Sequence, residues 1–202
     1  MKKTLSVFMA IIVFVSCGPS TKIVKSWHEP NASVNIKNIK KVLVIGLIKD
    51  ASARRIVEDK LVSMMKVHAV KSYDYLTDEL TGENNKLNEK LKSDSFDGVL
   101  IMRLVDVEKE TTYVPGSTGY PGYYGSYYGY YRYAAPNYYS PGYYQTDKNY
   151  MVETTVYSVT PDKLIWSATT KTVNPDNFDR AIEEIATAVA EKMRQDGFVT
   201  DK

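Results

Sequence analysis

Cys17 is the only cysteine of the 202-residue chain, and the residues before it have the pattern of an export signal. Lys2 and Lys3 provide a positive start, and an apolar segment of about eleven residues follows from Leu5 to Val15. A segment this short cannot cross a bilayer as a helix, which takes about 20 apolar residues. The pattern therefore predicts that residues 1–16 form a signal peptide that is removed on export.

The residues Phe14-Val15-Ser16-Cys17 resemble the lipobox of bacterial lipoproteins, apart from Phe14, where leucine is the commonest residue. In those proteins the cysteine receives acyl chains such as palmitate and becomes the first residue of the mature protein. A lone cysteine cannot form an internal disulfide, and in an exported protein an unpaired one calls for an explanation. The resemblance predicts lipidation at Cys17; an ordinary secretory signal with an unrelated cysteine is the alternative.

Other chemistry-bearing residues do not form a recognisable active site. His28 and His68 are the only histidines, and neither belongs to a metal-ligand spacing. The segment 46–50 lacks the glycine and lysine spacing of a phosphate-binding loop, and the chain has no Gly-x-Ser-x-Gly elbow. We therefore expect no metal, no cofactor and no enzymatic activity, with a hydrolase that uses an unfamiliar site as a minor alternative.

A charged cluster follows the first expected strand. Asp50, Arg54 and Arg55 lie where open α/β sheets often bind ligands, which makes a small-ligand site one interpretation. The other interpretation, which the pattern favours, is that Asp50 caps a helix and that Arg54, Arg55, Glu58 and Asp59 face solvent.

Tyrosines are concentrated in one segment, since 14 of the 17 lie between Tyr113 and Tyr150. Glycines and prolines punctuate this insertion, 113–149, and predict that no regular helix or long strand forms there. It contains one acid, Asp147, and two bases, Arg132 and Lys148. The candidate contact residues are the paired tyrosines Tyr123, Tyr124, Tyr127, Tyr128, Tyr130, Tyr131, Tyr138, Tyr139, Tyr143 and Tyr144.

Two interpretations of this insertion remain open. Each tyrosine offers a flat apolar face and a hydroxyl at small conformational-entropy cost, so the segment suits contact with sugar rings, peptidoglycan or another envelope protein. Alternatively it is a passive extension whose tyrosines pack on the domain or on one another. Nucleic acid is not an expected partner, because base-stacking platforms need a basic groove beside them and the mature chain is close to neutral.

The remaining segments predict a mixed sheet with helices packed on it. Residues 41–48 and 98–107 are nearly continuous apolar runs, as expected of strands covered on both faces. Helical patterns separate these runs from a short strand near 68–73, and two strands at 150–159 and 164–173 are joined by a turn containing Pro161. A last helix is expected to begin at Asn174-Pro175 and to bury an apolar stripe that starts at Phe178. The order is β-α-β-α-β, the insertion, then β-β-α, which is an α/β fold, with α+β as the alternative class.

Three motifs carry a resemblance to small α/β envelope lipoproteins of Gram-negative bacteria. They are KVLVIGL with the following Asp-Ala-Ser-Ala-Arg-Arg, Phe96-Asp97-Gly98-Val99-Leu100, and Lys163-Leu164-Ile165-Trp166-Ser167. The chain is more distantly similar to lipoproteins that build the curli secretion pore or activate cell-wall synthases. These motifs mark a fold, and they carry no catalytic residue across.

The expected organisation is a signal peptide at 1–16, a membrane tether at 17–38 that contributes an edge strand from Ile23 to Trp27, and one α/β domain at 39–202. Gly18 does not match the sorting patterns for inner-membrane retention, so the resemblance implies an outer-membrane protein that faces the periplasm. The expected function is a non-enzymatic binding or assembly module whose tyrosine-rich loop contacts an envelope protein. A glycan-binding or peptidoglycan-binding module is the main alternative.

Overall fold

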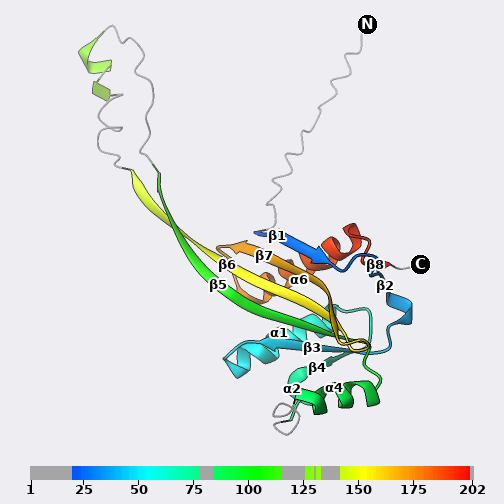
Figure 1. Cartoon of the computed structure of the whole chain (residues 1–202). Helices are drawn as coiled ribbons and strands as arrows, with labels where there is room; N and C mark the ends of the chain where they lie inside the picture. Colours follow the sequence, from blue (N-terminus) through cyan, green and yellow to red (C-terminus); the bar gives the residue numbers. More distant parts are fainter. Residues whose placement is uncertain (1–19, 78–83, 115–125, 130, 133–141, 201–202) are drawn as a thin grey trace, which may run out of the picture.

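A computed structural model describes residues 20–77, 84–114, 126–129, 131–132 and 142–200 of the chain. Its strands and helices follow one another in the order drawn in Figure 1. They are β1 Thr21–His28, β2 Val34–Asn35, the 3-10 helix Ile36–Asn38, β3 Val42–Leu47, α1 Ala51–Met64, β4 Ala69–Lys71, α2 Ser72–Tyr75, α4 Asn84–Ser93, β5 Gly98–Val114, β6 Tyr143–Ser158, β7 Lys163–Val173, α6 Phe178–Gln195 and β8 Val199–Thr200.

The main sheet of the described residues has six strands in the order β1-β7-β6-β5-β3-β4. Strand β3 runs parallel to β4 and to β5, whereas β5, β6, β7 and β1 pair antiparallel to one another. The parallel part comes from the two βα units, whose connections pass over the sheet as helices. The predicted α/β fold with a mixed sheet is thus confirmed.

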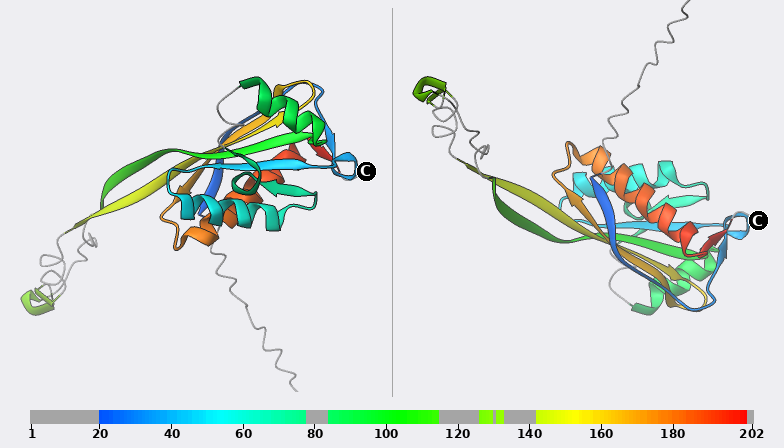
Figure 2. Two further views of the ribbon diagram at one scale, coloured as in Figure 1. Left: turned by 90° about the horizontal axis from the view of Figure 1, so that it is seen from below. Right: turned by 90° about the horizontal axis from the view of Figure 1, so that it is seen from above.

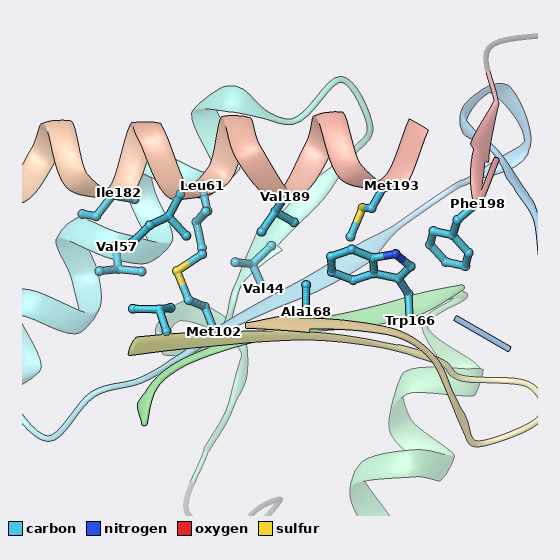
Figure 3. Packing of buried hydrophobic residues seen from close by; sticks show 12 residues of the cluster. Val44, Val57, Leu61, Met102, Trp166, Ala168, Ile182, Val189, Met193 and Phe198 are labelled. Carbon is cyan, nitrogen blue, oxygen red and sulfur yellow. The ribbon is translucent and has the colours of Figure 1, made fainter. Parts of the chain in front are cut away.

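Helices α1 and α6 cover one face of the sheet and enclose the larger hydrophobic core (Figure 2). Val44 on β3, Met102 on β5 and Trp166 on β7 point from the strands toward the helices (Figure 3). The helices contribute apolar residues at helical spacing to the same core, among them Val57 on α1 and Ile182 on α6. Trp166 is completely buried and stacks on Phe198, with 6.4 Å between the ring centroids.

A second, smaller core lies on the opposite face of the sheet. Leu43 on β3 packs there with Leu91 of α4, and Phe96 and Val159 complete the cluster. Alternate residues of β3 thus enter different cores, since neighbouring side chains of a strand point to opposite faces. This explains why the sequence of the strand is an unbroken apolar run.

The segment expected to be a tether is largely part of the fold. Thr21–His28 forms strand β1, which pairs with β7 along its whole length, so the sheet begins 18 residues before the predicted domain boundary at 39. The expected edge strand from Ile23 to Trp27 is present and longer than predicted. Threonine, isoleucine, valine and tryptophan favour strands, and the lysines between them hid this preference.

Strands β5 and β6 also continue into the predicted insertion. Tyr113 and Val114 end β5, and 143–149 begin β6, so these nine residues are paired strand rather than irregular loop. The predicted boundaries of the insertion followed the change in tyrosine and glycine content. The strands continue because valine, threonine and tyrosine favour extended pairing wherever glycine and proline are absent.

Helix α6 begins three residues later than the sequence predicts. Asn177, not Asn174, is the N-cap, and its side chain accepts a hydrogen bond from the Arg180 backbone N–H at 2.7 Å. Asn174 has a left-handed backbone, with φ of 43°, and ends strand β7 instead. Phe178, expected in the buried stripe, is therefore at the start of the helix and 48% exposed.

Candidate functional site

The longest strands of the molecule leave the body of the sheet together as a two-stranded ribbon (Figure 1). We define the ribbon as residues 108–114 of β5 and 143–149 of β6, which pair in register from Glu108↔Asn149 to Val114↔Tyr143. Strand β7 pairs with β6 only as far as Asn149. Both faces of a two-stranded ribbon are open to solvent, so the types of side chain that it carries decide what it can contact.

Tyrosines close the far end of the ribbon. Tyr113 and Tyr144 are register partners, and their rings lie 5.2 Å apart between centroids in a tilted arrangement. Gly142 permits this closure, because a Cβ at that position would lie 2.6 Å from the Val114 carbonyl oxygen and would also meet the Tyr113 ring. The ring pair stabilises the ribbon and presents its outer faces to solvent.

Five of the ten predicted contact tyrosines lie in the described residues, and all five are exposed. The exposed fractions are 88% for Tyr127, 61% for Tyr128, 65% for Tyr131, 60% for Tyr143 and 75% for Tyr144. Tyr113 is 52% exposed and joins this surface, although the prediction did not include it. The candidates Tyr123, Tyr124, Tyr130, Tyr138 and Tyr139, and the lipidation candidate Cys17, lie outside the described residues.

A brace at the root of the ribbon fixes where it leaves the sheet. Asn174 accepts a hydrogen bond from the Lys148 backbone N–H at 2.8 Å and donates one to Asp147 Oδ1 at 2.7 Å. The pKa of the Asp147 carboxyl is lowered by hydrogen bonds from the Gln145 and Asn174 side chains. The carboxylate is thus ionised at neutral pH and holds the β7–α6 turn against the ribbon.

Charge divides the ribbon into two zones. A charged band lies near the sheet and consists of Glu108, Lys109, Glu110, Asp147 and Lys148. Within this band, the Glu110 carboxylate lies 3.7 Å from Lys171 Nζ. Beyond this band the strands carry only threonine, glutamine, valine and tyrosine. We use the term tyrosine end for Tyr113, Tyr143 and Tyr144 of the ribbon together with the described tyrosines 127, 128 and 131, which lie in the sequence between its two strands.

A second apolar patch lies at the base of the ribbon, next to a β-bulge between Leu104 and Asp106. Leu104 and Val105 are each 49% exposed, and Val107 is 39% exposed. A bulge increases local twist and re-aims side chains, which accounts for neighbouring apolar residues in one strand that are all partly exposed. This base patch gives the ribbon a second surface for contact.

A buried carboxylate is the residue that sequence reasoning missed most clearly. Glu58, expected on the solvated face of α1, is completely buried. It accepts hydrogen bonds from the Gly46 N–H (2.9 Å), Ser72 Oγ (2.5 Å), the Tyr73 N–H (3.1 Å) and Arg54 Nε (3.0 Å). The only sequence signal was Arg54 four residues earlier, which also fits an exposed helical pair. With these donors satisfied, Glu58 ties α1 to β3 and α2.

The charged cluster after the first strand is structural. Asp50 is the N-cap of α1 and accepts a hydrogen bond from the Ala53 N–H at 2.7 Å, as predicted. Arg54 is not free in solvent but bonds Glu58 and Ser72, and Arg55 lies over the Tyr73 ring at 5.5 Å. Among the described residues, no three histidine, cysteine or acidic side chains gather where they could hold a metal ion.

An open groove of about 1350 Å³ runs between β1 and α6. Two of the acids that line it are paired: Glu183 with Lys60 at 2.9 Å, and Glu184 with Arg180 at 3.3 Å. Glu184 also receives hydrogen bonds from the Ser20 hydroxyl at 2.6 Å and the Ser20 N–H at 3.1 Å, which hold the start of β1 on α6. In the part of the chain that the structure covers, no helix is long and apolar enough to cross a membrane.

No protein-family model matches the chain, and no curated protein matches it. Solved structures give distant likenesses. A PelC dodecamer from Paraburkholderia phytofirmans has a TM-score of 0.41 and 13% identity, covering 84% of this chain and 95% of that one. The lipoprotein GNA1162 from Neisseria meningitidis has a TM-score of 0.40 and 9% identity, covering 77% and 99%. Likenesses at this level do not assign the chain to a family.

Proposed function

We propose that this chain is a lipid-anchored, non-enzymatic protein of the bacterial cell envelope that works as a binding or assembly module, with the ribbon as its contact arm. Acylated Cys17 would hold it to the outer membrane on the periplasmic side. The observation that carries the proposal is the ribbon itself, which places exposed tyrosine rings beyond the body of the sheet.

The fold leaves aromatic surface of the tyrosine end exposed to water, and burying that surface against a partner would favour binding. Tyrosine is enriched at protein interfaces because its ring provides apolar area and its hydroxyl finds a hydrogen-bond partner at the rim. At the tyrosine end, only Tyr113 and Tyr144 have a ring contact within the described residues. Contact with another envelope component would bury these faces, whereas the free protein gains little from them.

Photo-crosslinking tests the contact arm directly. A photoreactive phenylalanine analogue would replace Val107 in the base patch or Tyr144 at the tyrosine end, and Ile56, exposed on α1, serves as the matched control position. We expect specific adducts from cell envelopes at the ribbon positions and not at position 56. Adducts that are equally abundant at all three positions, or none at the ribbon, would contradict the proposal.

A glycan-binding module is the second candidate, and the low charge of the tyrosine end favours it, because sugar rings stack on aromatic faces without needing ion pairs. The test is co-sedimentation with insoluble peptidoglycan. Wild type should sediment, and a variant with Tyr127, Tyr128, Tyr131, Tyr143 and Tyr144 changed to Ser should remain soluble. The control changes the exposed residues Val24 and Phe178 to Ser; if it loses binding equally, the tyrosines are not the sugar surface.

A further inference from the structure

We infer that the tyrosine end of the ribbon rests in the headgroup region of the same membrane that holds the acyl anchor. This inference depends on the proposed acylation of Cys17, and it names the component that this end of the contact arm meets. It is carried by the position of Ser20, the end of the sheet from which the ribbon leaves, and the distribution of charge along the ribbon.

The chain is fixed to the folded domain from Ser20 onward. The Ser20 hydroxyl and N–H both donate hydrogen bonds to Glu184, and the Ser20 carbonyl accepts one from the Val173 N–H at 3.0 Å. Cys17 lies only three residues earlier in the sequence. Three extended residues span at most about 10 Å, so an anchor at Cys17 would keep the membrane surface within roughly that distance of Ser20.

The ribbon leaves the sheet at this same end. One row of register partners crosses the sheet from Thr21 on β1 through Thr172 on β7 and Tyr150 on β6 to Val107 on β5. The ribbon begins immediately beyond this row, and Figure 1 shows the start of β1, the end of β7 and the root of the ribbon together. Seven extended residue pairs reach about 24 Å past the row, further than the link to the anchor.

The distribution of charge along the ribbon indicates how the folded body is oriented relative to the membrane. The last acidic residues toward the end are Glu110 and Asp147, and between Thr111 and Thr146 the sequence contains one charged residue, Arg132. A tyrosine-rich, nearly uncharged end beyond a charged band matches the membrane interface, where tyrosine rings sit at headgroup level and a cation can meet phosphate. If the body turned the other way, these rings would remain in water.

Depth-dependent quenching tests the inference on the full-length acylated chain, purified with its anchor and inserted in phosphatidylethanolamine–phosphatidylglycerol vesicles. Tyr144→Cys carries an environment-sensitive dye, because Cys17 is blocked by acylation. Glu89→Cys on α4, at an exposed position outside the ribbon, carries the same dye as the control. Lipids with a nitroxide near the headgroup should quench the dye at position 144 at least about twofold more than at position 89, as expected for a residue at the interface.

The mass of the peptide that contains Cys17 separates the two hypotheses. An acyl mass with equal quenching at positions 144 and 89 overturns the lipid contact and leaves the proposed anchoring intact. A Cys17 without acyl chains overturns the anchoring, and the lipid contact that depends on it falls as well. An acyl mass together with selective quenching at position 144 supports both. Because Tyr144 is 75% exposed, the substitution leaves the cores untouched.

Discussion

Glu58 shows, at the scale of single residues, how one carboxylate can connect three elements. Its oxygens receive donors from β3, from α1 itself and from α2, and the side chain is shielded from water. Each hydrogen bond to a buried charge contributes more than a neutral one, and removing the acceptor leaves several donors unsatisfied. The residue is thus a structural link, and its substitution should affect stability.

Glu58→Ala should lower the free energy of unfolding by about 3 kcal/mol, because the Gly46 N–H, Arg54 and Ser72 lose a buried acceptor. Glu58→Gln keeps the shape and one acceptor oxygen, so its loss should be smaller. Urea unfolding followed by circular dichroism measures both. Glu183→Ala, which removes an exposed ion pair with Lys60, is the control and should cost less than about 1 kcal/mol. Equal losses for Glu58→Ala and Glu183→Ala would contradict the structural role.

Glu184 gives a prediction about pH. The Ser20 hydroxyl hydrogen bond lowers the pKa of the Glu184 carboxyl below its ordinary value of 4.5. The unfolded chain therefore binds a proton more readily than the folded one, so the stabilisation is complete above pH 4.5 and is lost as pH falls through the folded-state pKa.

Between pH 6 and pH 3, wild type should lose more stability than Glu184→Gln, which cannot ionise. The contributions of other carboxylates are shared by the two proteins and cancel in the difference. Urea unfolding at each pH gives the comparison. In wild type, the protection of the Ser20 and Thr21 amides against hydrogen exchange, relative to their intrinsic rates at each pH, should fall in acid. If the two pH profiles are parallel, Glu184 does not hold the start of β1 through its charge.

Secondary-structure elements show where the sequence is informative and where it is ambiguous. The apolar runs of β3 and β5 and the helix start at Asp50 could be predicted because periodicity and capping are local properties. The start of α6 was predicted wrongly at Asn174, because proline after asparagine suits the first helical position, whereas Asn177 is the N-cap. The choice depends on Lys148 and Asp147, which contact Asn174 from a distant part of the chain.

Substitutions at the two asparagines should separate their roles. Asn177→Ala should lower the free energy of unfolding by about 1 kcal/mol, as expected for the loss of an N-cap. Asn174→Ala should instead accelerate hydrogen exchange at Lys148, whose N–H loses its acceptor, in addition to introducing strain at a positive φ. Asn174→Gly is the control for backbone strain. If Asn177→Ala is neutral and Asn174→Ala shortens α6, the cap assignment is wrong.

At the scale of the whole molecule, the body and the ribbon make separate energetic contributions. Both hydrophobic cores lie within the body, and the tyrosine end contributes to neither. This separation could not be predicted from the sequence, since a tyrosine-rich segment fits packing on the domain as well as projection from it. The sequence predicted an edge strand at Ile23 to Trp27 but not its partner, because β7 lies far away in the chain.

Replacing residues 111–146 with an Asn-Gly turn should leave a folded body, because such a turn closes an antiparallel pair without the tyrosine end. We expect the midpoint of thermal unfolding to change by no more than about 3 °C, which corresponds to about 1 kcal/mol for a domain of this size. Calorimetry provides the measurement. A loss of cooperative unfolding would mean that the tyrosine end packs on the body and is needed for folding.

The pairing of β1 with β7 has a consequence for the order of folding. Thr21 and Thr172 bond through their hydroxyls at 2.8 Å across a separation of 151 residues. During synthesis β1 emerges among the first residues of the described domain, yet its hydrogen-bonding partner is made almost last. The backbone groups of β1 that pair with β7 therefore have no partner strand until residues 163–173 are present. Lys22 and Lys25 protect β1 while it lacks this partner, because charged side chains on an edge strand disfavour pairing with the strands of other chains.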